Sequence, residues 1–552
     1  MEMSPKLVER KALLAPSNLL SSESNSLRRK ASSTVSFNGD VLLYGYEETP
    51  PSTSVFKVGK GSPGFLKRTL LSSPYIRKTN SVGCDKEGAL GATSFGEMIC
   101  FCGCACCEIA REKRWCRVAA GVTLFLVLML SLGIVIGYVV LINDQVHISF
   151  ANENATDIYI TWVSASAKRH GPPAVRYRLS NDTANVAGTI VTGYTTTYKQ
   201  SSLTSQSVHR VRLRQLAPGQ EYHYIYGGSS SLLQFDDDSA FSFRTPRHSQ
   251  ANSTVKAVIF GDMGSINGRA LPYVGEEIAT GRVDFLFHLG DFAYDLYTLF
   301  GINGRYFMSK IEQVSSLVPY QTIPGNHEME NEFSEYRNLF TMPGYEMRAP
   351  KNDFFYALRI GPLKIVAINT ELYYDASSID AKERQKAWLA KELKRTNRSE
   401  TPWLITMGHR PFYCSNTGND DCTDGLRDKV RLDLESMFVS ANVTIAFFAH
   451  EHSYERTCPI ANGRCGEAKP RIADGVAVFD KPPRLPINII AGSAGGREHL
   501  QAFVDAPNSW SAMRSKTYGY GVLSTNEQCL FWKQKAAAGD EAAVVDAVSI
   551  CR

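Results

Sequence analysis

The 552-residue sequence lacks three features that would each indicate a different class of protein. No signal peptide is recognisable at its start. Its formal net charge is only +5, so the composition gives no sign of nucleic-acid binding. Two separated Cys-x-x-Cys pairs, the usual spacing of a structural zinc site, are also missing. The rest of the composition, 43% hydrophobic and 21% charged, is ordinary for a globular protein with room for several domains.

The small positive charge is concentrated at one end. Residues 1–117 carry a net charge of +6 and the remainder carries −1. Because the first hundred residues are rich in Ser, Gly, Pro and Lys without a sustained period, we predict a mostly disordered tail. Three short patterns in it match an acidic dileucine sorting signal, a basophilic kinase site and a phosphatase-docking segment, and each also arises by chance: Glu9–Leu14, Arg28–Ser32 and Val35–Phe37.

Six cysteines are clustered just before the longest apolar run of the chain. Their juxtamembrane position favours S-acylation, with a soft-metal site as the alternative. They are Cys100, Cys102, Cys104, Cys106, Cys107 and Cys116.

Val118–Ile142 contains no charged residue. A helix of this length rises ~37 Å at ~1.5 Å per residue, enough to cross a ~30 Å hydrocarbon core. Basic residues between Arg111 and Arg117 precede it, and Asp144 follows it. The positive-inside rule therefore predicts a signal-anchor (type II) membrane protein with a cytoplasmic N-terminus and a luminal or extracellular C-terminal part. A buried core helix is the alternative.

Two further patterns fit a luminal C-terminal part. It has six cysteines, and proximity favours the pairs Cys414–Cys422, Cys458–Cys465 and Cys529–Cys551, although other connectivities remain open. It also has five N-x-Ser/Thr glycosylation sequons. These lie at Asn154, Asn181, Asn252, Asn397 and Asn442.

Residues 145–246 contain short alternating segments separated by turn residues, which predicts a β-sandwich. The segments are Gln145–Phe150, Ile158–Val163, Val175–Leu179, Val208–Leu213, Glu221–Tyr226 and Phe241–Pro246.

Residues 254–552 contain five short polar motifs, four of which directly follow an apolar, strand-like run. Polar groups collect beyond the carboxyl ends of strands in layered α/β folds. The motifs together offer seven possible metal ligands: two Asp, one Asn, three His and one Tyr. Seven ligands are too many for one small cation and suit two cations that share a carboxylate. Since we place His450 and His452 on a strand, both face the same side. The motifs are Gly261–Gly264, Gly290–Tyr294, Gly325–Glu328, Gly408–Arg410 and Ala449–His452.

This motif set, in this order, resembles the purple acid phosphatases, a branch of the metallophosphoesterases. The resemblance runs from about Gln145 to about Cys529 and implies a fibronectin type III-like domain followed by a calcineurin-like domain. The fold class implied is an α/β sandwich of two mixed sheets flanked by helices. A Tyr in the second motif implies an Fe(III) phenolate, the source of the family's colour.

The resemblance also implies a role for each matching residue. Fe(III) is expected at Asp262, Tyr294 and His452, with Asp291 as the bridging, catalytic carboxylate. A divalent ion (Zn, Fe or Mn) is expected at Asn326, His409 and His450. Asn326 and His327 are expected to meet the phosphate, and His327 to stabilise its charge or protonate the leaving group.

Two departures from the family pattern stand out. Ala449 replaces the usual Gly, a one-methyl change that we expect to be tolerated. The stretch Cys414–Asp421 has no His where the larger plant enzymes carry two, so His327 takes more of the general-acid role. The stretch either shapes specificity or is an exposed disulfide loop.

The expected function is acid phosphatase hydrolysis of phosphomonoesters, on small molecules or phosphoproteins, with a metal-bound hydroxide as nucleophile. A phosphodiesterase or nucleotide pyrophosphatase, a catalytically dead membrane receptor, and a protein whose tail is the effector are the alternatives. The sequence leaves open whether the protein forms a homodimer. The expected location is the endolysosome or vacuole, or the cell surface.

Overall fold

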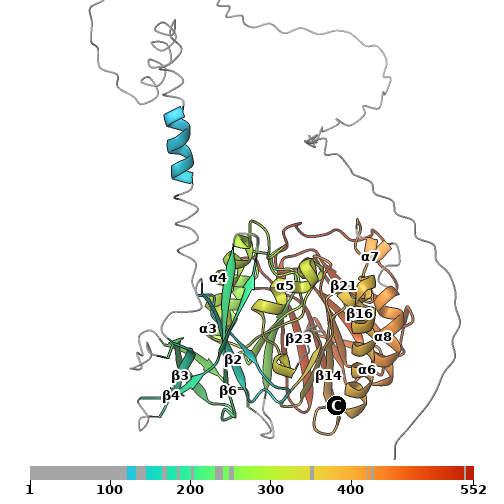
Figure 1. The fold of residues 1–552 in the computed structure, drawn as a ribbon. Helices are drawn as coiled ribbons and strands as arrows, with labels where there is room; N and C mark the ends of the chain where they lie inside the picture. Colours follow the sequence, from blue (N-terminus) through green and yellow to red (C-terminus); the bar gives the residue numbers. More distant parts are fainter. Residues whose placement is uncertain are drawn as a thin grey trace, which may run out of the picture. The chain divides into compact units, whose positions relative to one another are not determined.

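A computed structural model of the chain describes most of the residues after 143 and part of the predicted membrane span (Figure 1). The tail, most of Val118–Ile142 and the sequon at Asn252 lie outside the described residues. Residues 121–131 are helical, and no helix among the described residues is both long and apolar enough to cross a membrane. The described ranges are 121–131, 133, 144–164, 171–182, 187–200, 204–229, 240–247, 254–347, 354–418, 420–423, 428–539 and 542–552.

The first part is a sandwich of two antiparallel four-stranded sheets, ordered β1-β2-β6-β5 and β4-β3-β7-β8. The alternating apolar residues of the sequence face each other between these sheets, as Ile160, Val175, Val211 and Tyr224 illustrate. The strands are β1 His147–Phe150, β2 Ile158–Ser164, β3 Pro173–Leu179, β4 Thr189–Thr192, β5 Tyr194–Lys199, β6 Ser205–Leu213, β7 Glu221–Gly228 and β8 Phe241–Arg244.

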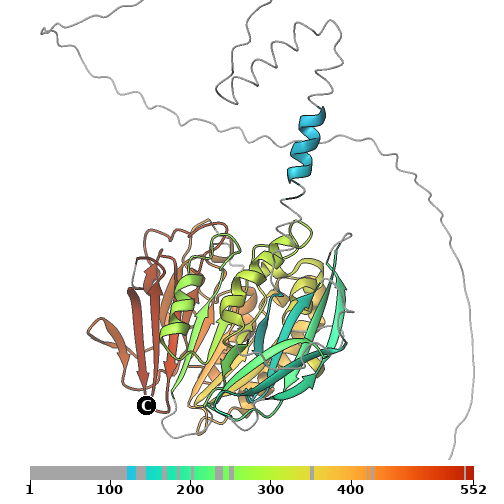
Figure 2. The same ribbon diagram turned by 90° about the vertical axis from the view of Figure 1, so that its left-hand side faces the viewer.

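The second part contains two mixed eight-stranded sheets, which run through its centre in Figures 1 and 2. One has the order β11-β10-β9-β22-β23-β24-β19-β18. The other has the order β12-β13-β14-β15-β20-β16-β17, with β21 also paired to β16. Their strands are β9 Val255–Phe260, β10 Phe285–His288, β11 Tyr320–Thr322, β12 Tyr356–Ile360, β13 Leu363–Ala367, β14 Trp403–Met407, β15 Ile445–Phe448, β16 Tyr454–Ala461, β17 Arg464–Cys465, β18 Arg471–Ala473, β19 Val476–Phe479, β20 Ile487–Ala491, β21 Ser511–Ser515, β22 Gly519–Thr525, β23 Cys529–Ala536 and β24 Val544–Cys551.

Strand periodicity decides how the layers pack. In β14, Ile405 and Met407 belong to the core between the sheets, whereas Leu404 faces the outer side. There it joins Leu389 of α6 and Leu434 of α8, the two helices that lie along one flank in Figure 1. The helices are α3 Leu271–Thr280, α4 Ile302–Ser315, α5 Glu330–Leu339, α6 Ile379–Arg395, α7 Asp420–Thr423 and α8 Asp428–Ser440, with 3-10 turns at Asn326–Glu328, Tyr345–Met347, Glu371–Tyr373 and Ala376–Ser378.

The sandwich and the second part share a buried polar seam. His147 of β1 reaches the carbonyl of Leu339 at 3.0 Å, and the fully buried Arg210 of β6 donates to Oγ1 of Thr341 at 2.8 Å. Ser149 donates its hydroxyl to the carbonyl of Thr341 at 2.5 Å. Separating the two parts would remove these partners from Nε2 of His147, Nε of Arg210 and the hydroxyl of Ser149, and buried polar atoms without partners are costly.

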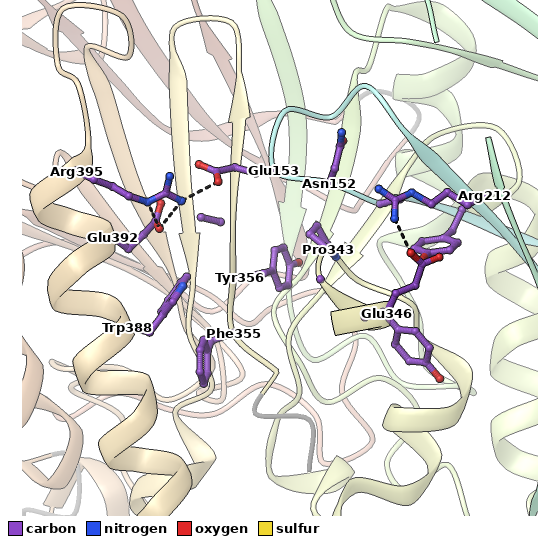
Figure 3. Close-up of a pocket in the computed structure, with 15 residues that line it drawn as sticks. Asn152, Glu153, Arg212, Pro343, Glu346, Phe355, Tyr356, Trp388, Glu392 and Arg395 are labelled. Carbon is purple, nitrogen blue, oxygen red and sulfur yellow. Dashed lines mark hydrogen bonds and ion pairs between the residues drawn. The ribbon is translucent and has the colours of Figure 1, made fainter. Parts of the chain in front are cut away.

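A groove of about 420 Å³ lies beside this seam (Figure 3). Glu153 pairs there with Arg395 at 2.7 Å, and Arg212 pairs with Glu346 at 2.7 Å. These ion pairs link the sandwich to α6 and to the turn at Tyr345–Met347. The charged side chains of the groove thus stabilise the contact between the two parts.

The predicted fold class is confirmed for the sandwich and for the mixed sheets with flanking helices. The spacing of apolar residues in the sequence predicts three helices, at Arg305–Leu317, Ser378–Arg395 and Leu426–Phe438. They match α4, α6 and α8 within a few residues. One placement is wrong. His450 and His452 lie in a loop rather than on a strand, because β15 ends at Phe448 and the chain then turns through a left-handed conformation at His450 (φ 69°).

Candidate metal centre

The seven residues predicted as metal ligands come together at the carboxyl ends of five strands. In one sheet, β9, β10 and β11 are parallel neighbours, and the loops after them carry Asp262, Asp291 and Asn326. In the other sheet, β14 and β15 are parallel neighbours followed by His409 and His450. Parallel strands end at the same edge, so the topology brings these side chains to one place.

Four of these residues adopt a left-handed backbone. The φ angles are 57° at Asp262, 54° at Asp291, 51° at Tyr294 and 69° at His450. Each such conformation costs a non-glycine residue on the order of 1–2 kcal/mol. The neighbouring packing therefore holds the four side chains in directions that the chain would not adopt alone.

The two loops around Asp291 and Asn326 are tied by one buried carboxylate. Glu328 accepts hydrogen bonds from the backbone N–H groups of Asp291 at 2.9 Å, Phe292 at 3.0 Å and Gly325 at 2.8 Å. A Cβ at Gly325 would lie 2.2 Å from Oδ1 of Asp291, so only glycine permits this approach.

Three ligand candidates form one group. The phenolic oxygen of Tyr294 lies 2.6 Å from Nε2 of His452 and 3.4 Å from Oδ1 of Asp262. Nε2 of His452 lies 3.6 Å from the same carboxylate oxygen. An oxygen pair and an imidazole nitrogen at this spacing suit a single hard or borderline cation.

A second group lies beside the first. Nε2 of His409 lies 3.1 Å from Oδ1 of Asn326 and 3.4 Å from Oδ2 of Asp291. One ring nitrogen of His450 joins His409 and Asp291 within 4.8 Å. The groups are linked because Oδ2 of Asp262 accepts the backbone N–H of His450 at 2.9 Å.

Hydrogen bonds fix which nitrogen of each histidine carries the lone pair. Nδ1 of His409 donates to the carbonyl of Leu289 at 2.6 Å, and Nδ1 of His452 donates to the carbonyl of His499 at 2.9 Å. Their Nε2 atoms are therefore free to coordinate. His450 is reversed: its Nε2 lies 2.7 Å from Oδ2 of Asp421, and its buried Nδ1 has no partner among the described residues.

The charge balance of the cluster also fits cations. Among the described residues, neither Asp262 nor Asp291 pairs with Lys or Arg; their ion-pair partners are histidines. Burial opposes protonation of His409, but the charges of Asp291 and Asp262 outweigh it and raise the pKa of His409 to about 10. Two buried carboxylates thus lack a fixed counter-charge, and the orphaned Nδ1 of His450 completes a donor set that fits two metal ions.

His327 lies over this cluster without belonging to it. Its backbone N–H donates to Oδ1 of Asp291 at 3.1 Å, and its ring lies 4.6 Å from that of Tyr294. Its Nδ1 donates to Oδ1 of Asp295 at 2.8 Å. Asp291 and Asp295 outweigh the effect of burial and raise the pKa of His327. Sequence reasoning missed Asp295, although it directly follows Tyr294.

A cavity of about 510 Å³ adjoins the cluster at Tyr294. Its wall is partly apolar, with Ile266 exposed by 84% and Leu299 by 66%. Arg497 also lines it and forms no ion pair within the described part of the chain. The site therefore has room for an organic group next to the predicted ligands.

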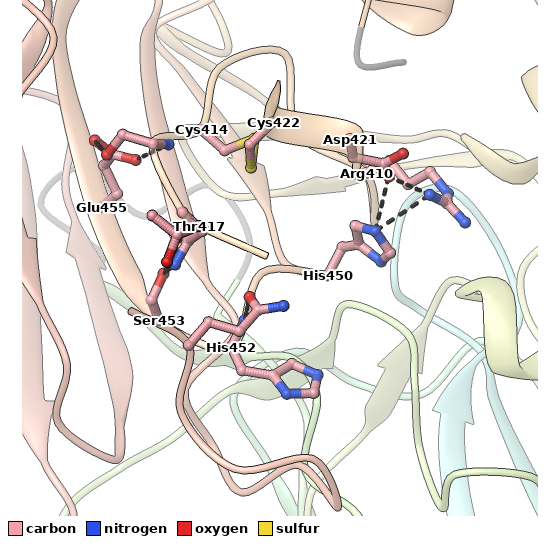
Figure 4. Close-up of a disulfide and its surroundings, with 12 residues drawn as sticks. Arg410, Cys414, Thr417, Asp421, Cys422, His450, His452, Ser453 and Glu455 are labelled. Carbon is pink, nitrogen blue, oxygen red and sulfur yellow. Dashed lines mark hydrogen bonds and ion pairs between the residues drawn. A yellow bond between two sulfur atoms is a disulfide. The ribbon is translucent and has the colours of Figure 1, made fainter. Parts of the chain in front are cut away.

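The two sequence departures have structural explanations. The methyl of Ala449 lies against Gly261. A Cβ at Gly261 would lie 2.3 Å from this methyl, so the glycine at position 261 provides the space that Ala449 needs. The stretch Cys414–Asp421 is exposed only in part: Thr417 and Gly418 are exposed, whereas Cys414 and Cys422 are buried and Asp421 contacts His450 (Figure 4). The three favoured disulfides, including this one, are present.

Comparison with known proteins supports this reading. Residues 143–245 match the purple acid phosphatase N-terminal domain, 255–454 match the calcineurin-like phosphoesterase, and 485–547 match the iron/zinc purple acid phosphatase-like protein C domain. Human acid phosphatase type 7 is 34% identical over 77% of this chain and 95% of its own length. The zebrafish (Danio rerio) protein is 33% identical over 74% and 91%.

A more distant relative is Arabidopsis thaliana purple acid phosphatase 18, 25% identical over 72% of this chain and 82% of its own. Among solved structures, purple acid phosphatase PPD1 from yellow lupin has a TM-score of 0.62, with 21% identity and 74% of each chain covered, a likeness of fold. Purple acid phosphatases use a binuclear metal centre, typically iron with a second divalent metal. On these matches and this site, the chain belongs to the purple acid phosphatase family of metal-dependent phosphoesterases.

Proposed function

We propose that the protein hydrolyses phosphomonoesters at acid pH with an Fe(III)–divalent metal pair. Asp262, Tyr294 and His452 would hold Fe(III), and Asp291 would be shared. Asn326, with His409 and His450, would hold zinc, iron(II) or manganese. The observation that carries the proposal is the convergence of seven donors whose two carboxylates pair with no Lys or Arg among the described residues. Three of the donors are histidines whose tautomers leave a lone pair for a metal.

When bound, such a metal pair supplies Lewis-acid charge for the phosphate and an activated water for in-line attack. The chain's own contribution is orientation and a proton. Asp295 holds the Nδ1–H of His327, so Nε2 is the nitrogen that can donate to the leaving oxygen. The carboxylate also stabilises the charged imidazole, which favours an acid role below neutral pH.

The alcohol part of the substrate would occupy the cavity beside Tyr294. Its apolar wall at Ile266 and Leu299 suits a hydrocarbon or aromatic body, and Arg497 suits an anionic substituent. Organic phosphomonoesters of this kind, free or as a phosphorylated side chain, are the substrates that this arrangement favours.

The test is metal analysis, visible absorption and a phosphatase assay on the full-length chain from a secretory host. One iron and one divalent ion per chain, a charge-transfer band and faster hydrolysis of aryl phosphomonoesters than of phosphodiesters are expected. A colourless protein with two zinc ions would exclude the Fe(III) phenolate. Preference for a phosphodiester or nucleotide pyrophosphate would reject the proposed substrate class, and a folded, metal-free protein would reject hydrolysis altogether.

We also propose that the enzyme is anchored by Val118–Ile142, with the catalytic part in the lumen or outside the cell. The uncharged length of this segment and the basic residues before it support the proposal. The asparagines of four sequons are solvent-exposed, namely Asn154, Asn181, Asn397 and Asn442. Glycosidase-sensitive mass on the C-terminal part, retention of the chain in membranes after alkaline washing, and protease access to the tail in intact microsomes are expected. An unglycosylated chain that alkaline washing releases would contradict it.

A further inference from the structure

The three histidines of the metal cluster are not held in the same way. His409 and His452 are each backed by a neutral backbone carbonyl, at 2.6 Å and 2.9 Å. His450 is backed by the carboxylate of Asp421, at 2.7 Å. Only this histidine therefore has a charged group behind its ring.

The contact determines the chemistry of the ring. Nε2 of His450 lies 2.7 Å from Oδ2 of Asp421 and 3.1 Å from Nη1 of Arg410. Because the carboxylate is the nearer partner and can only accept a hydrogen bond, Nε2 of His450 carries the proton and Nδ1 keeps its lone pair. That Nδ1 is buried and has no partner among the described residues. A carboxylate on the far nitrogen makes an imidazole a stronger donor to a metal and fixes the direction of its lone pair.

Asp421 is itself held from two sides (Figure 4). It belongs to α7, where the neighbouring Cys422 is bonded to Cys414. On the other side, the guanidinium of Arg410 forms an ion pair with it, and that guanidinium is fixed by Glu371 at 2.8 Å. The carboxylate therefore has little freedom to leave His450.

We propose that Asp421 is a positioning residue that sets the affinity of the divalent-metal position through His450. The Fe(III) position, whose histidine has a neutral partner, does not depend on it. The inference rests on the two-metal centre proposed above, and it gives the acidic stretch that replaces the plant enzymes' two histidines a function of its own.

The experiment compares full-length wild-type protein with Asp421→Ala and Asp421→Asn. Ala removes the acceptor, whereas Asn keeps an oxygen that can accept from Nε2 and removes only the charge. We expect the dissociation constant for zinc, measured by competition with a chelator after selective removal of the divalent ion, to rise by roughly 10- to 100-fold in Ala and by less in Asn. Iron content and the visible band should not change.

Asp480→Asn is the matched control, because Asp480 forms an exposed ion pair with Arg471 away from the cluster. It should keep the wild-type zinc affinity. Wild-type zinc affinity in Asp421→Ala would overturn the inference. Loss of iron together with zinc in the isosteric Asp421→Asn would also overturn it, because the effect would then be general unfolding and not specific to the divalent-metal position. If wild-type protein holds no second metal, the proposed function fails as well, and the wild-type measurement alone shows this.

Discussion

Nδ1 of His327 and Oδ1 of Asp295 lie 2.8 Å apart, and the carboxylate comes from the residue directly after Tyr294. One loop thus supplies both a predicted metal ligand and the group that orients the predicted general acid. The arrangement couples the position of the proton donor to the position of the cluster, because a shift of this loop would move both.

Replacing His327 by Ala should remove the proton donor and leave the metals in place. We expect kcat to fall by roughly 10²- to 10⁴-fold, the usual contribution of a positioned acid. Asp295→Asn should reduce kcat less, because Nδ1–H keeps an acceptor. Steady-state kinetics and metal analysis on the same samples check this. Loss of metal from His327→Ala would place the residue among the ligands instead.

Tyr294→Phe tests the phenolate directly. The variant removes one oxygen from a group in which that oxygen lies 2.6 Å from His452. We expect the visible band to vanish while the far-ultraviolet circular dichroism is kept. Tyr306→Phe, a change in the wall of the neighbouring cavity, is the control and should keep the colour. A coloured Tyr294→Phe protein would show that another group binds the iron.

Leu299→Ala tests the proposed leaving-group cavity. Trimming an apolar wall should lower kcat/KM for a bulky aryl phosphate by roughly 3- to 30-fold, since a few buried methylenes contribute about 1–2 kcal/mol. Hydrolysis of a small alkyl phosphate should change little. Leu432→Ala, an equally exposed leucine of α8, is the control. Equal losses for large and small substrates would contradict the assignment.

His147 predicts how stability depends on pH. Burial lowers the pKa of His147 to about 4, whereas an unfolded chain would have its ordinary value of about 6.5. Between these values the unfolded state binds a proton that the folded state does not, so acid destabilises the fold. At pH 4.5 the loss is about 2 to 3 kcal/mol relative to pH 8.

His147→Gln should therefore flatten this dependence. We expect the difference in unfolding free energy between pH 8 and pH 4.5 to shrink by about 2 kcal/mol, measured by urea denaturation at both values. The variant is expected to be less stable than wild type at pH 8, because a fitted hydrogen-bonding group is replaced. An unchanged slope would show that another group dominates the acid response.

The sequence was most informative where a strand led directly into a polar motif. The runs before Asp262, Asp291 and His409 predicted both the strand and the position of the ligand. An apolar run that ends in a small residue indicates a buried strand followed by a turn. Of the late strands, Ile487–Ala491 and Gly519–Leu523 were predicted and match β20 and β22. Cys529–Ala536 was missed, although it alternates between buried and accessible positions. This alternation could have predicted a strand at Cys529–Ala536.

Other parts of the site could not be read from the sequence. Nothing in the residue type of Tyr294 indicates a left-handed backbone, which the surrounding packing imposes. Asp421 lies in the stretch Cys414–Asp421, which stood out from the sequence only because it has no histidine. Its contact with His450 depends on how α7 is folded back over the loop after β15, a tertiary relation without a local pattern.

The pairing of β9 with β22 has a consequence for how the protein is made. Val255, at the start of the catalytic part, lies opposite Thr525, near the end of the chain. The sheet that carries the first three metal motifs therefore gains its central neighbour only after all five motifs have been synthesised. During synthesis on the ribosome, the first three motifs cannot reach their final positions until β22 has been made. A premature stop codon after the last motif would yield a chain that contains every predicted ligand but lacks the strand that pairs with β9.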